Sequence, residues 1–197
     1  MPTGVAIRDV REQLFAAAER VLVRDGPNAL TSRAVTTEAG CAKGVLHRHF
    51  ADFDAFLVEL VLDRIARIDG QAAALRDSAG TGTVAGNLVG TLRDLFGSVA
   101  VAIVGLITFR DELRVRLRQV TRPGVPLLSE AVAMVASYLT AERAMGRIAA
   151  DADVDSLALA LIGSGHLLFA GREGIPREDV DRVVSTVIAD VVQRRLL

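Results

Sequence analysis

The sequence predicts an all-α fold, and three observations support this prediction. Apolar residues recur every three or four positions through most of the 197-residue chain, as they do along one face of an α-helix. Glycine and proline lie between these periodic stretches, where they end helices. No stretch alternates apolar and polar residues strongly enough to predict a β-strand.

Composition limits the kinds of protein that the chain can be. It is 51% hydrophobic and 24% charged, which is typical of a folded protein. The formal net charge is −1, so any nucleic-acid binding must come from a local surface. One cysteine excludes an intramolecular disulfide and a cysteine-based zinc cluster. The uncharged runs 95–109 and 156–171 are shorter than the roughly 20 apolar residues of a membrane span. We expect a cytoplasmic protein without membrane contact.

The first helix is expected over Ile7–Arg24, and it ends at the breaker Gly26-Pro27-Asn28. Thr31 and Ser32 then favour a helix N-cap, and a short helix runs from Ser32 to Ala39. Gly40 is the residue that most easily takes the left-handed conformation at a helix end.

A second short helix is expected over Lys43–His49, with Leu46 and Phe50 on one apolar side. Two short helices that meet across a glycine-containing turn form a helix-turn-helix, which places its second helix in the DNA major groove. We expect residues 1–51 to form a three-helix DNA-binding unit.

The remaining chain, residues 52–197, is expected to be helical. Asp52 is a candidate N-cap for a long helix that ends near Arg76, and a loop of small residues follows at 78–83. The later helices are predicted over 84–109 (as one helix or two), 110–120, 127–145, about 154–170 and 177–195.

The segment Leu30–Phe50 resembles the TetR (tetracycline-repressor) family of bacterial transcription regulators. The carrying residues are a helix that starts with threonine, Ala-Gly at the turn, and Lys43-Gly44-Val45-Leu46-His47-Arg48-His49-Phe50. Arg24-Asp25-Gly26 before this segment and Asp52-x-Asp-Ala-Phe-Leu after it also match. The resemblance implies a homodimer whose C-terminal helical domain, 52–197, binds a small molecule and dimerises, and a repressor that this ligand releases from its operator.

Three positions depart from the family pattern. His47 replaces the usual tyrosine, Phe53 the usual lysine of the following helix, and Ala42 the usual serine or threonine. Each departure removes one expected phosphate contact, and phosphate contacts supply much of the affinity for DNA.

The helical register predicts which side chains face DNA. Arg48 suits guanine O6 and N7, Val45 suits a thymine methyl, and Lys43 suits a phosphate. Gly44 lets the backbone approach closely. The expected DNA-binding set is Thr31, Ser32, Arg33, Lys43, Gly44, Val45, His47, Arg48 and His49.

The C-terminal domain is expected to bind its effector in an apolar cavity with few polar anchors. Candidate residues are Phe96, Val99, Ile103, Arg110, Met134, Tyr138, His166 and Phe169. By resemblance, the helices near 154–170 and 177–195 form the dimer surface, where Gly163, Ser164 and Gly165 would allow close helix approach. The same residues could instead pack inside one subunit.

We expect no cofactor, no metal site and no catalytic residues. His47 and His49 are two positions apart on a helix and point about 200° apart, so they cannot share an ion. The alternatives are a small-molecule-binding helical protein or enzyme with a non-functional DNA-binding head, and a helical scaffold. Cys41 is the one candidate nucleophile, and no paired base is evident.

Overall fold

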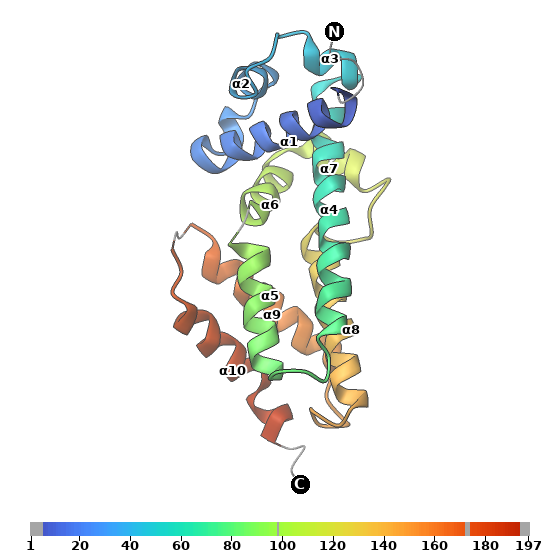
Figure 1. Ribbon diagram of the computed structural model, residues 1–197, viewed down its shortest axis with the longest axis vertical. Coiled ribbons are helices and arrows are strands. Elements are labelled where there is room, and N and C mark those ends of the chain that lie inside the picture. The colour runs from blue at the N-terminus through green and yellow to red at the C-terminus, as the bar shows by residue number, and fades with distance from the viewer. Residues whose placement is uncertain (1–5, 98, 172–173, 194–197) are drawn as a thin grey trace. The chain divides into compact units, whose positions relative to one another are not determined.

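The computed structural model describes residues 6–97, 99–171 and 174–193, and within these ranges the protein contains helices and no strand (Figure 1). The predicted all-α class is confirmed. The elements are α1 (Ala6–Asp25), η1 (Pro27–Ala29), α2 (Ser32–Glu38), α3 (Val45–His49), α4 (Phe53–Asp77), α5 (Val84–Phe96), α6 (Ala100–Phe109), α7 (Asp111–Leu117), α8 (Leu128–Ala144), α9 (Val154–Phe169) and α10 (Arg177–Gln193).

The predicted helices are confirmed with small differences at their ends. The stretch predicted over 84–109 is two helices, α5 and α6. The helix predicted over 110–120 ends at Leu117 and continues as turns. α10 is described as far as Gln193, so the last two residues predicted for it lie outside the described residues. Glycine and capping residues therefore predicted helix boundaries to within a few positions.

The chain forms two compact units. The N-terminal unit contains the described residues up to Asp63 and a later segment, Ala102–Thr121. The C-terminal unit contains Arg64–Val101 and the described residues from Arg122 onward. The chain therefore passes from one unit to the other within α4, within α6 and after α7.

An aromatic cluster forms the centre of the N-terminal unit. Phe50 meets Phe56 edge-on with ring centroids 5.0 Å apart, and Phe15 of α1 lies 5.9 and 5.6 Å from these two rings. Phe53 stacks on Phe56 at 5.7 Å. Aromatic pairs at such distances add about 0.5–1.5 kcal/mol each beyond their buried area. The cluster joins α1, the end of α3 and the start of α4.

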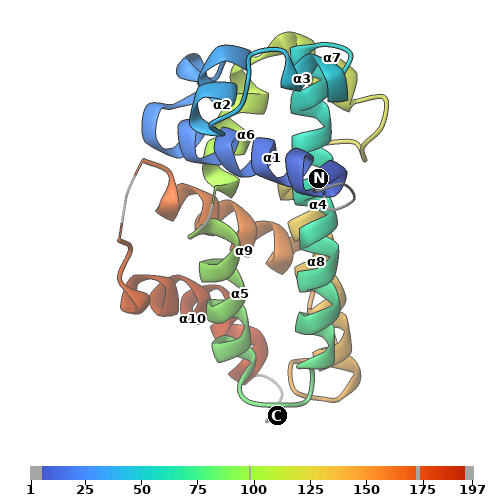
Figure 2. The ribbon, with the colours of Figure 1, turned by 45° about the horizontal axis from the view of Figure 1, so that its top comes forward.

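In the C-terminal unit, α9 packs against α5, α8 and α10, and α10 also packs against α5 (Figure 2). Gly165 of α9 makes the contact with α5 possible. A Cβ at this position would lie 2.8 Å from the Phe96 ring and 3.3 Å from Leu92. α9 therefore approaches α5 more closely than any residue with a side chain would allow.

A buried polar network ties the loop between α4 and α5 to the end of α8. The fully buried Glu142 accepts from the Gly80 N–H (3.3 Å) and faces Arg147 Nε (3.1 Å). The Arg147 guanidinium donates to the Gly82 carbonyl at 2.6 Å. Asn87 Nδ2 donates to the hydroxyl of the buried Tyr138 at 3.0 Å. Burial, followed by the hydrogen bond to Glu142, raises the pKa of Tyr138 well above its ordinary value, so the phenol stays neutral.

Among the described residues, no single helix is both long and apolar enough to cross a membrane. The neighbouring helices α5 and α6 meet that length and composition only when they are taken together across a bend.

The close approach of α9 to α5 predicts the effect of a single methyl group. Gly165→Ala should lower the free energy of unfolding by about 1–3 kcal/mol, because the new Cβ forces Phe96 and Leu92 aside. The control is Gly90→Ala in α5, where a Cβ meets nothing within 4 Å and alanine is the better helix former. Urea unfolding of both variants measures the difference, and equal stability of the two would contradict this account of the contact.

Candidate nucleic-acid interface

α2 begins and ends as its sequence predicts. The Thr31 backbone is extended, and its hydroxyl oxygen accepts the Ala34 N–H at 3.1 Å, which caps the helix. Gly40 has a φ of +65°, the left-handed conformation expected after the helix. The Cys41 N–H donates to the Thr36 carbonyl at 3.0 Å. These bonds define the turn that separates α2 from α3.

α3 presents the predicted register. It starts at Val45, two residues later than expected, because Ala42–Gly44 form a turn closed by the Val45 N–H on the Ala42 carbonyl (2.9 Å). Leu46 is fully buried, and Phe50 is 4% exposed. Burial of these two side chains on one side fixes which residues of α3 face outward.

The structure places the predicted DNA-binding residues on the surface. Val45, His49 and Ser32 are half-buried, and the other six are exposed, namely Thr31, Arg33, Lys43, Gly44, His47 and Arg48. A Cβ on Gly44 would meet nothing within 4 Å, so the backbone there is open to an approaching surface.

An ion-pair network holds α2 against α1. Glu38 accepts from Arg20 Nε at 2.7 Å and from Arg24 Nη1 at 3.0 Å. The hydrogen bonds from Arg20 and then Arg24 lower the pKa of Glu38 below its ordinary value of 4.5. Arg24 also pairs with Asp25 at 2.9 Å. The first helix of the motif is therefore fixed by charged contacts as well as by its buried side.

The basic residues of the N-terminal unit whose side chains the structure describes divide into two groups. Arg11, Arg20, Arg24, Arg110, Arg114 and Arg116 pair with carboxylates of the same unit. Arg33, Lys43, Arg48 and, just beyond α7, Arg118 have no carboxylate partner among the residues that the structure describes. A cation without a carboxylate partner can pair with a phosphate without first breaking an ion pair. Three of the four unpaired cations, Arg33, Lys43 and Arg48, lie on the helix-turn-helix, where DNA would meet it.

The predicted effector residues are not gathered in one described cavity. Phe96, Val99, Met134 and Tyr138 are buried in the C-terminal unit. His166 and Phe169 each lie 6.0 Å from Phe96, measured between ring centroids. Nδ1 of His166 is buried without a hydrogen-bond partner among the described residues, and burial lowers the pKa of this imidazole.

The other two predicted effector residues, Ile103 and Arg110, belong to the N-terminal unit. Arg110 is engaged there, since its Nε donates to Asp54 at 2.8 Å and its guanidinium lies 5.3 Å from the centre of the Phe53 ring.

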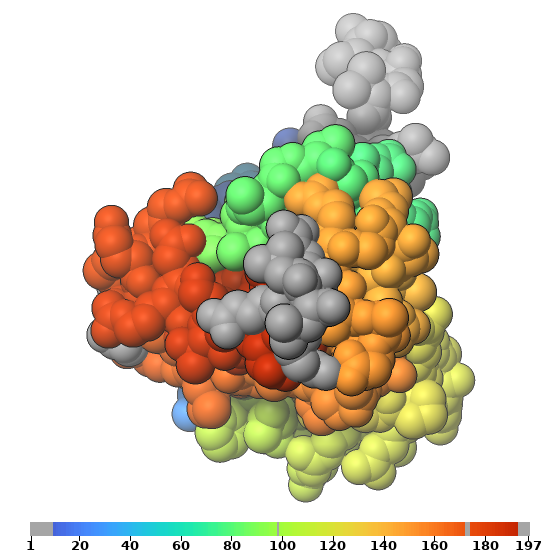
Figure 3. All heavy atoms as spheres, turned by 90° about the horizontal axis from the view of Figure 1, so that it is seen from below, coloured from blue at the N-terminus to red at the C-terminus, as the bar shows by residue number. Residues whose placement is uncertain are grey.

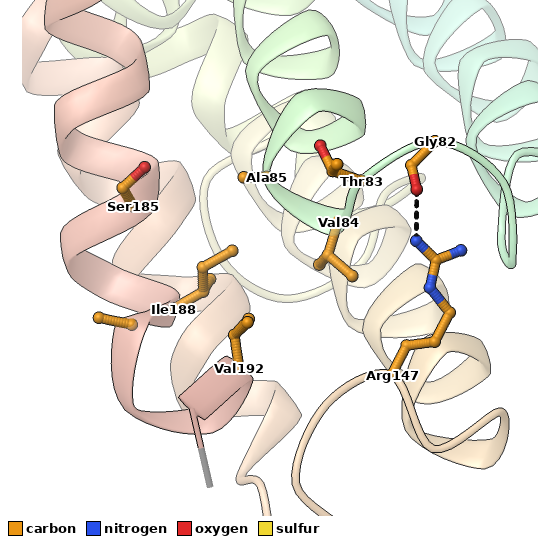
Figure 4. Close-up of a pocket in the computed structure, with 9 residues that line it drawn as sticks. Gly82, Thr83, Val84, Ala85, Arg147, Ser185, Ile188 and Val192 are labelled. Carbon is orange, nitrogen blue, oxygen red and sulfur yellow. Dashed lines mark hydrogen bonds between the residues drawn. The ribbon is translucent and has the colours of Figure 1, made fainter. Parts of the chain in front are cut away.

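The C-terminal unit has a hollow of about 520 Å³ that the sequence did not indicate. Its lining residues come from α10, the start of α5 and Arg147 just after α8, and Figure 3 views the end of the unit at which these elements lie. Val84 and the α10 residues Ile188 and Val192 form its apolar wall, and Arg147 and Ser185 lie at its rim (Figure 4). Its lining comes from helix ends that are far apart in sequence, so no periodic pattern could predict it.

A smaller groove of about 310 Å³ lies between the end of α4 and α5. Its lining is largely polar or small, and it includes Gln71, Ser78, Asn87, Thr91 and Asp94. None of the eight predicted effector residues lines either hollow. Within the described chain, no three His, Cys, Asp or Glu side chains are grouped to hold a metal ion.

The helical fold and the exposed cations of the helix-turn-helix are together typical of helical DNA-binding proteins. Residues 14–60 match the family model of bacterial regulatory proteins of the tetR family. This segment of the chain is a TetR-family N-terminal domain, as predicted from Leu30–Phe50. A comparison with curated proteins finds no significant match.

Solved structures of TetR-family regulators share the fold over nearly the whole chain. A TetR-family transcriptional regulator of Mesorhizobium loti is 14% identical, with a TM-score of 0.70 over 97% of this chain and 98% of that one. The regulator FadR of Bacillus subtilis, solved with stearoyl-CoA, is 17% identical, with a TM-score of 0.67 over 90% and 97% of the two chains. A gamma-butyrolactone receptor described as ArpA-like is 22% identical, with a TM-score of 0.60 over 95% and 97%.

The contacts of Glu38 predict a pH dependence of stability. Its folded-state pKa is lowered, so its contribution is present above pH 4.5 and is lost as pH falls through the lower folded value. Glu38→Gln should therefore lower the melting temperature at neutral pH. The difference from the wild type should disappear in acid.

Thermal melts of both proteins across this pH range measure the effect. Glu12→Gln in α1, an exposed residue, is the control and should match the wild type throughout. A difference between Glu38→Gln and the wild type that persists unchanged in acid would count against the ion-pair explanation.

Proposed function

We propose that the chain is a DNA-binding transcriptional regulator, a repressor that a small molecule in the C-terminal unit releases from its operator. The observation that supports this most directly is the surface of the helix-turn-helix. Arg33, Lys43 and Arg48 are exposed there without carboxylate partners among the described residues, while the neighbouring arginines of the same unit are paired. A local basic face is what a chain of net charge −1 needs to bind DNA.

The chemistry of α3 suits base reading in the major groove. Arg48 can donate two hydrogen bonds to guanine, and Val45 can contact a thymine methyl group. Lys43 and Arg33 flank the helix and supply charge for the phosphate backbone, with Thr31, Ser32, His47 and His49 as further polar contacts. Gly44 leaves room for the backbone to approach DNA.

The protein is proposed to act as a homodimer through α9 and α10. Beyond Asp155 in its first turn, the exposed face of α9 carries no charge. It is formed by Ser156, Leu159, Ala160, Gly163 and Leu167, with Ala170 directly after the helix. Leu159 is 64% exposed and Leu167 is 75% exposed. Large apolar side chains on an uncharged helix face are typical of an interface. Gly163 faces open space, so a partner helix could approach there, whereas Gly165 is used inside the subunit.

A dimer fits the requirement of DNA reading, because two recognition helices must reach half-sites about 34 Å apart. An effector then acts by binding one conformation of the dimer more tightly than the other. It can shift the equilibrium between the two conformations only by the difference between its binding free energies for them. FadR of Bacillus subtilis was solved with an acyl-CoA, and the gamma-butyrolactone receptor is named for its ligand. These similar proteins support a small-molecule effector, and we propose that it binds in the C-terminal unit of a cytoplasmic protein.

Two places in the C-terminal unit are candidates for that site. One is the surroundings of Phe96, where His166 offers a buried nitrogen without a described partner. The other is the hollow of about 520 Å³ beside α10, whose size falls within the usual range of ligand pockets.

DNA binding is tested by a gel shift with the DNA upstream of the protein's own gene at low salt. The wild type should bind. Arg48→Ala should cost about 1–3 kcal/mol and relax the preference for one base pair, whereas Lys43→Ala should weaken all sequences and reduce the salt slope by about 1. Arg122→Ala, an exposed arginine of the C-terminal unit, is the control. Absence of binding by the wild type at low salt would favour the alternative of a small-molecule-binding protein or enzyme with an inert head.

The dimer is tested by a charge on the outer face of α9. Leu167→Arg should give a monomer in analytical ultracentrifugation, because an arginine at a symmetric interface meets its own copy or buried apolar surface. Val125→Arg, at a residue that is 42% exposed and lies outside α9 and α10, should leave the dimer intact. A dimer that survives Leu167→Arg together with Leu159→Arg would place the interface elsewhere.

A further inference from the structure

The connection between α3 and α4 consists of only three residues, Phe50, Ala51 and Asp52. Three residues span at most about 10 Å, so the position of α3 depends directly on where α4 begins. Any contact that fixes the first turn of α4 therefore also fixes α3.

Asp52 makes two kinds of contact at this point. Its Oδ1 accepts the Ala55 N–H at 2.7 Å, which caps α4. Both of its carboxylate oxygens also accept from Arg116 of α7, at 2.9 and 3.1 Å from Nη1 and at 3.1 Å from Nη2. A bidentate arginine–carboxylate pair restricts orientation as well as distance.

The other end of α7 is attached to the same turn. Arg110 precedes α7, and its Nε donates to Asp54 at 2.8 Å. Its guanidinium also lies over the Phe53 ring, 5.3 Å from the centroid. Both ends of α7 thus bind within three consecutive residues at the start of α4, and α7 lies beside that start in both views (Figures 1 and 2).

The opposite side of this turn is held by the aromatic cluster. Phe50 packs edge-on against Phe56, and Arg11 lies over the Phe50 ring at 4.5 Å. Arg11 also pairs with Glu59, one helical turn beyond Phe56. The residues that connect α3 to α4 are therefore fixed from α1 on one side and from α7 on the other.

We propose that Arg116 and Arg110 are positioning residues for DNA recognition. Together with Asp52 and Asp54 they form a clamp, the α7 clamp, that sets the start of α4 and thereby the angle at which α3 meets DNA. This inference rests on the proposed function. Arg116 does not need to touch DNA, because its charge is already matched by Asp52.

The salt dependence of binding distinguishes positioning from contact. A side chain that neutralises a phosphate contributes to the slope of affinity against salt, because it releases a counterion. A side chain that only places the recognition helix changes the affinity for the operator and leaves this slope unchanged. It also leaves binding to unrelated DNA unchanged, since that binding is mostly electrostatic.

The experiment measures binding of the full chain to its operator and to a scrambled duplex of equal length, at several salt concentrations. Arg116→Ala should weaken operator binding about two- to five-fold, the range for an exposed ion pair, without changing the salt slope or the affinity for scrambled DNA. The matched control is Arg118→Ala, an exposed arginine just beyond α7 that has no described partner, and it should change neither affinity.

Asp52→Asn tests the pair from its other side. Asparagine is an equally good N-cap, so α4 stays capped while the ion pair is lost. Asp52→Asn should weaken operator binding as Arg116→Ala does, and the double variant should be no weaker than either single one. Arg116→Lys keeps the charge but loses the bidentate geometry, so it should be intermediate. Thermal melts verify that each variant is folded.

Three results would overturn the clamp while the proposed function stands. These are wild-type operator affinity in Arg116→Ala, a reduced salt slope in that variant, or additive losses in the double variant. If the wild type does not prefer its operator to scrambled DNA, the proposed function fails and the clamp fails with it.

Discussion

The connection of three residues between α3 and α4 is the constraint on which the N-terminal unit depends. α3 is a helix of five residues, too short to be stable by itself. Its position must come from Leu46 and Phe50, which are buried, and from the residues that follow them. Those residues lie between an aromatic cluster and two arginines. The DNA-facing side of α3 is exposed to solvent. The position of this short helix is therefore fixed by the contacts of its buried side and of its C-terminal end.

In this unit, the presence or absence of a carboxylate partner distinguishes arginines that hold helices together from cations that are available to DNA. Most of its arginines are matched by carboxylates that tie one helix to another, as Arg20 and Arg24 tie α1 to Glu38 of α2. Of the unmatched cations, three lie on α2 and around α3, and Arg118 lies just beyond α7. A chain with almost no net charge can in this way have a local positive surface. Its acidic residues either lie away from that surface or are paired with other arginines.

Much of the fold could be predicted from the sequence, because its signals are local. Thr31, Gly40 and Asp52 act at helix ends through their own backbone or the next turn. Leu46 and Phe50 are four positions apart with polar residues between them, and this spacing sets the register of α3. The pairing of Arg110 and Arg116 with Asp54 and Asp52 could not be predicted. These partners are 56 and 64 residues apart, and an arginine-rich amphipathic helix has the same sequence pattern whether its charges are solvated or paired. For this reason Arg110 was expected at an effector site, whereas the structure places it at the start of α4. The hollow beside α10 gave no signal either, because its walls are ordinary helix residues brought together by packing.

The turn of the helix-turn-helix also concentrates the chemical reactivity of the chain. Lys43 carries the only side-chain amine in the sequence, and Cys41, two residues earlier, carries the only thiol. Lys43 is exposed, and Cys41 is partly exposed. Reagents that alkylate thiols would therefore mark this turn and no other side chain, and a bound duplex would shield it. Reagents that acylate amines would mark Lys43 together with the α-amine of the chain. Covalent labelling of the unmodified protein becomes a site-specific report of whether its DNA-facing surface is occupied.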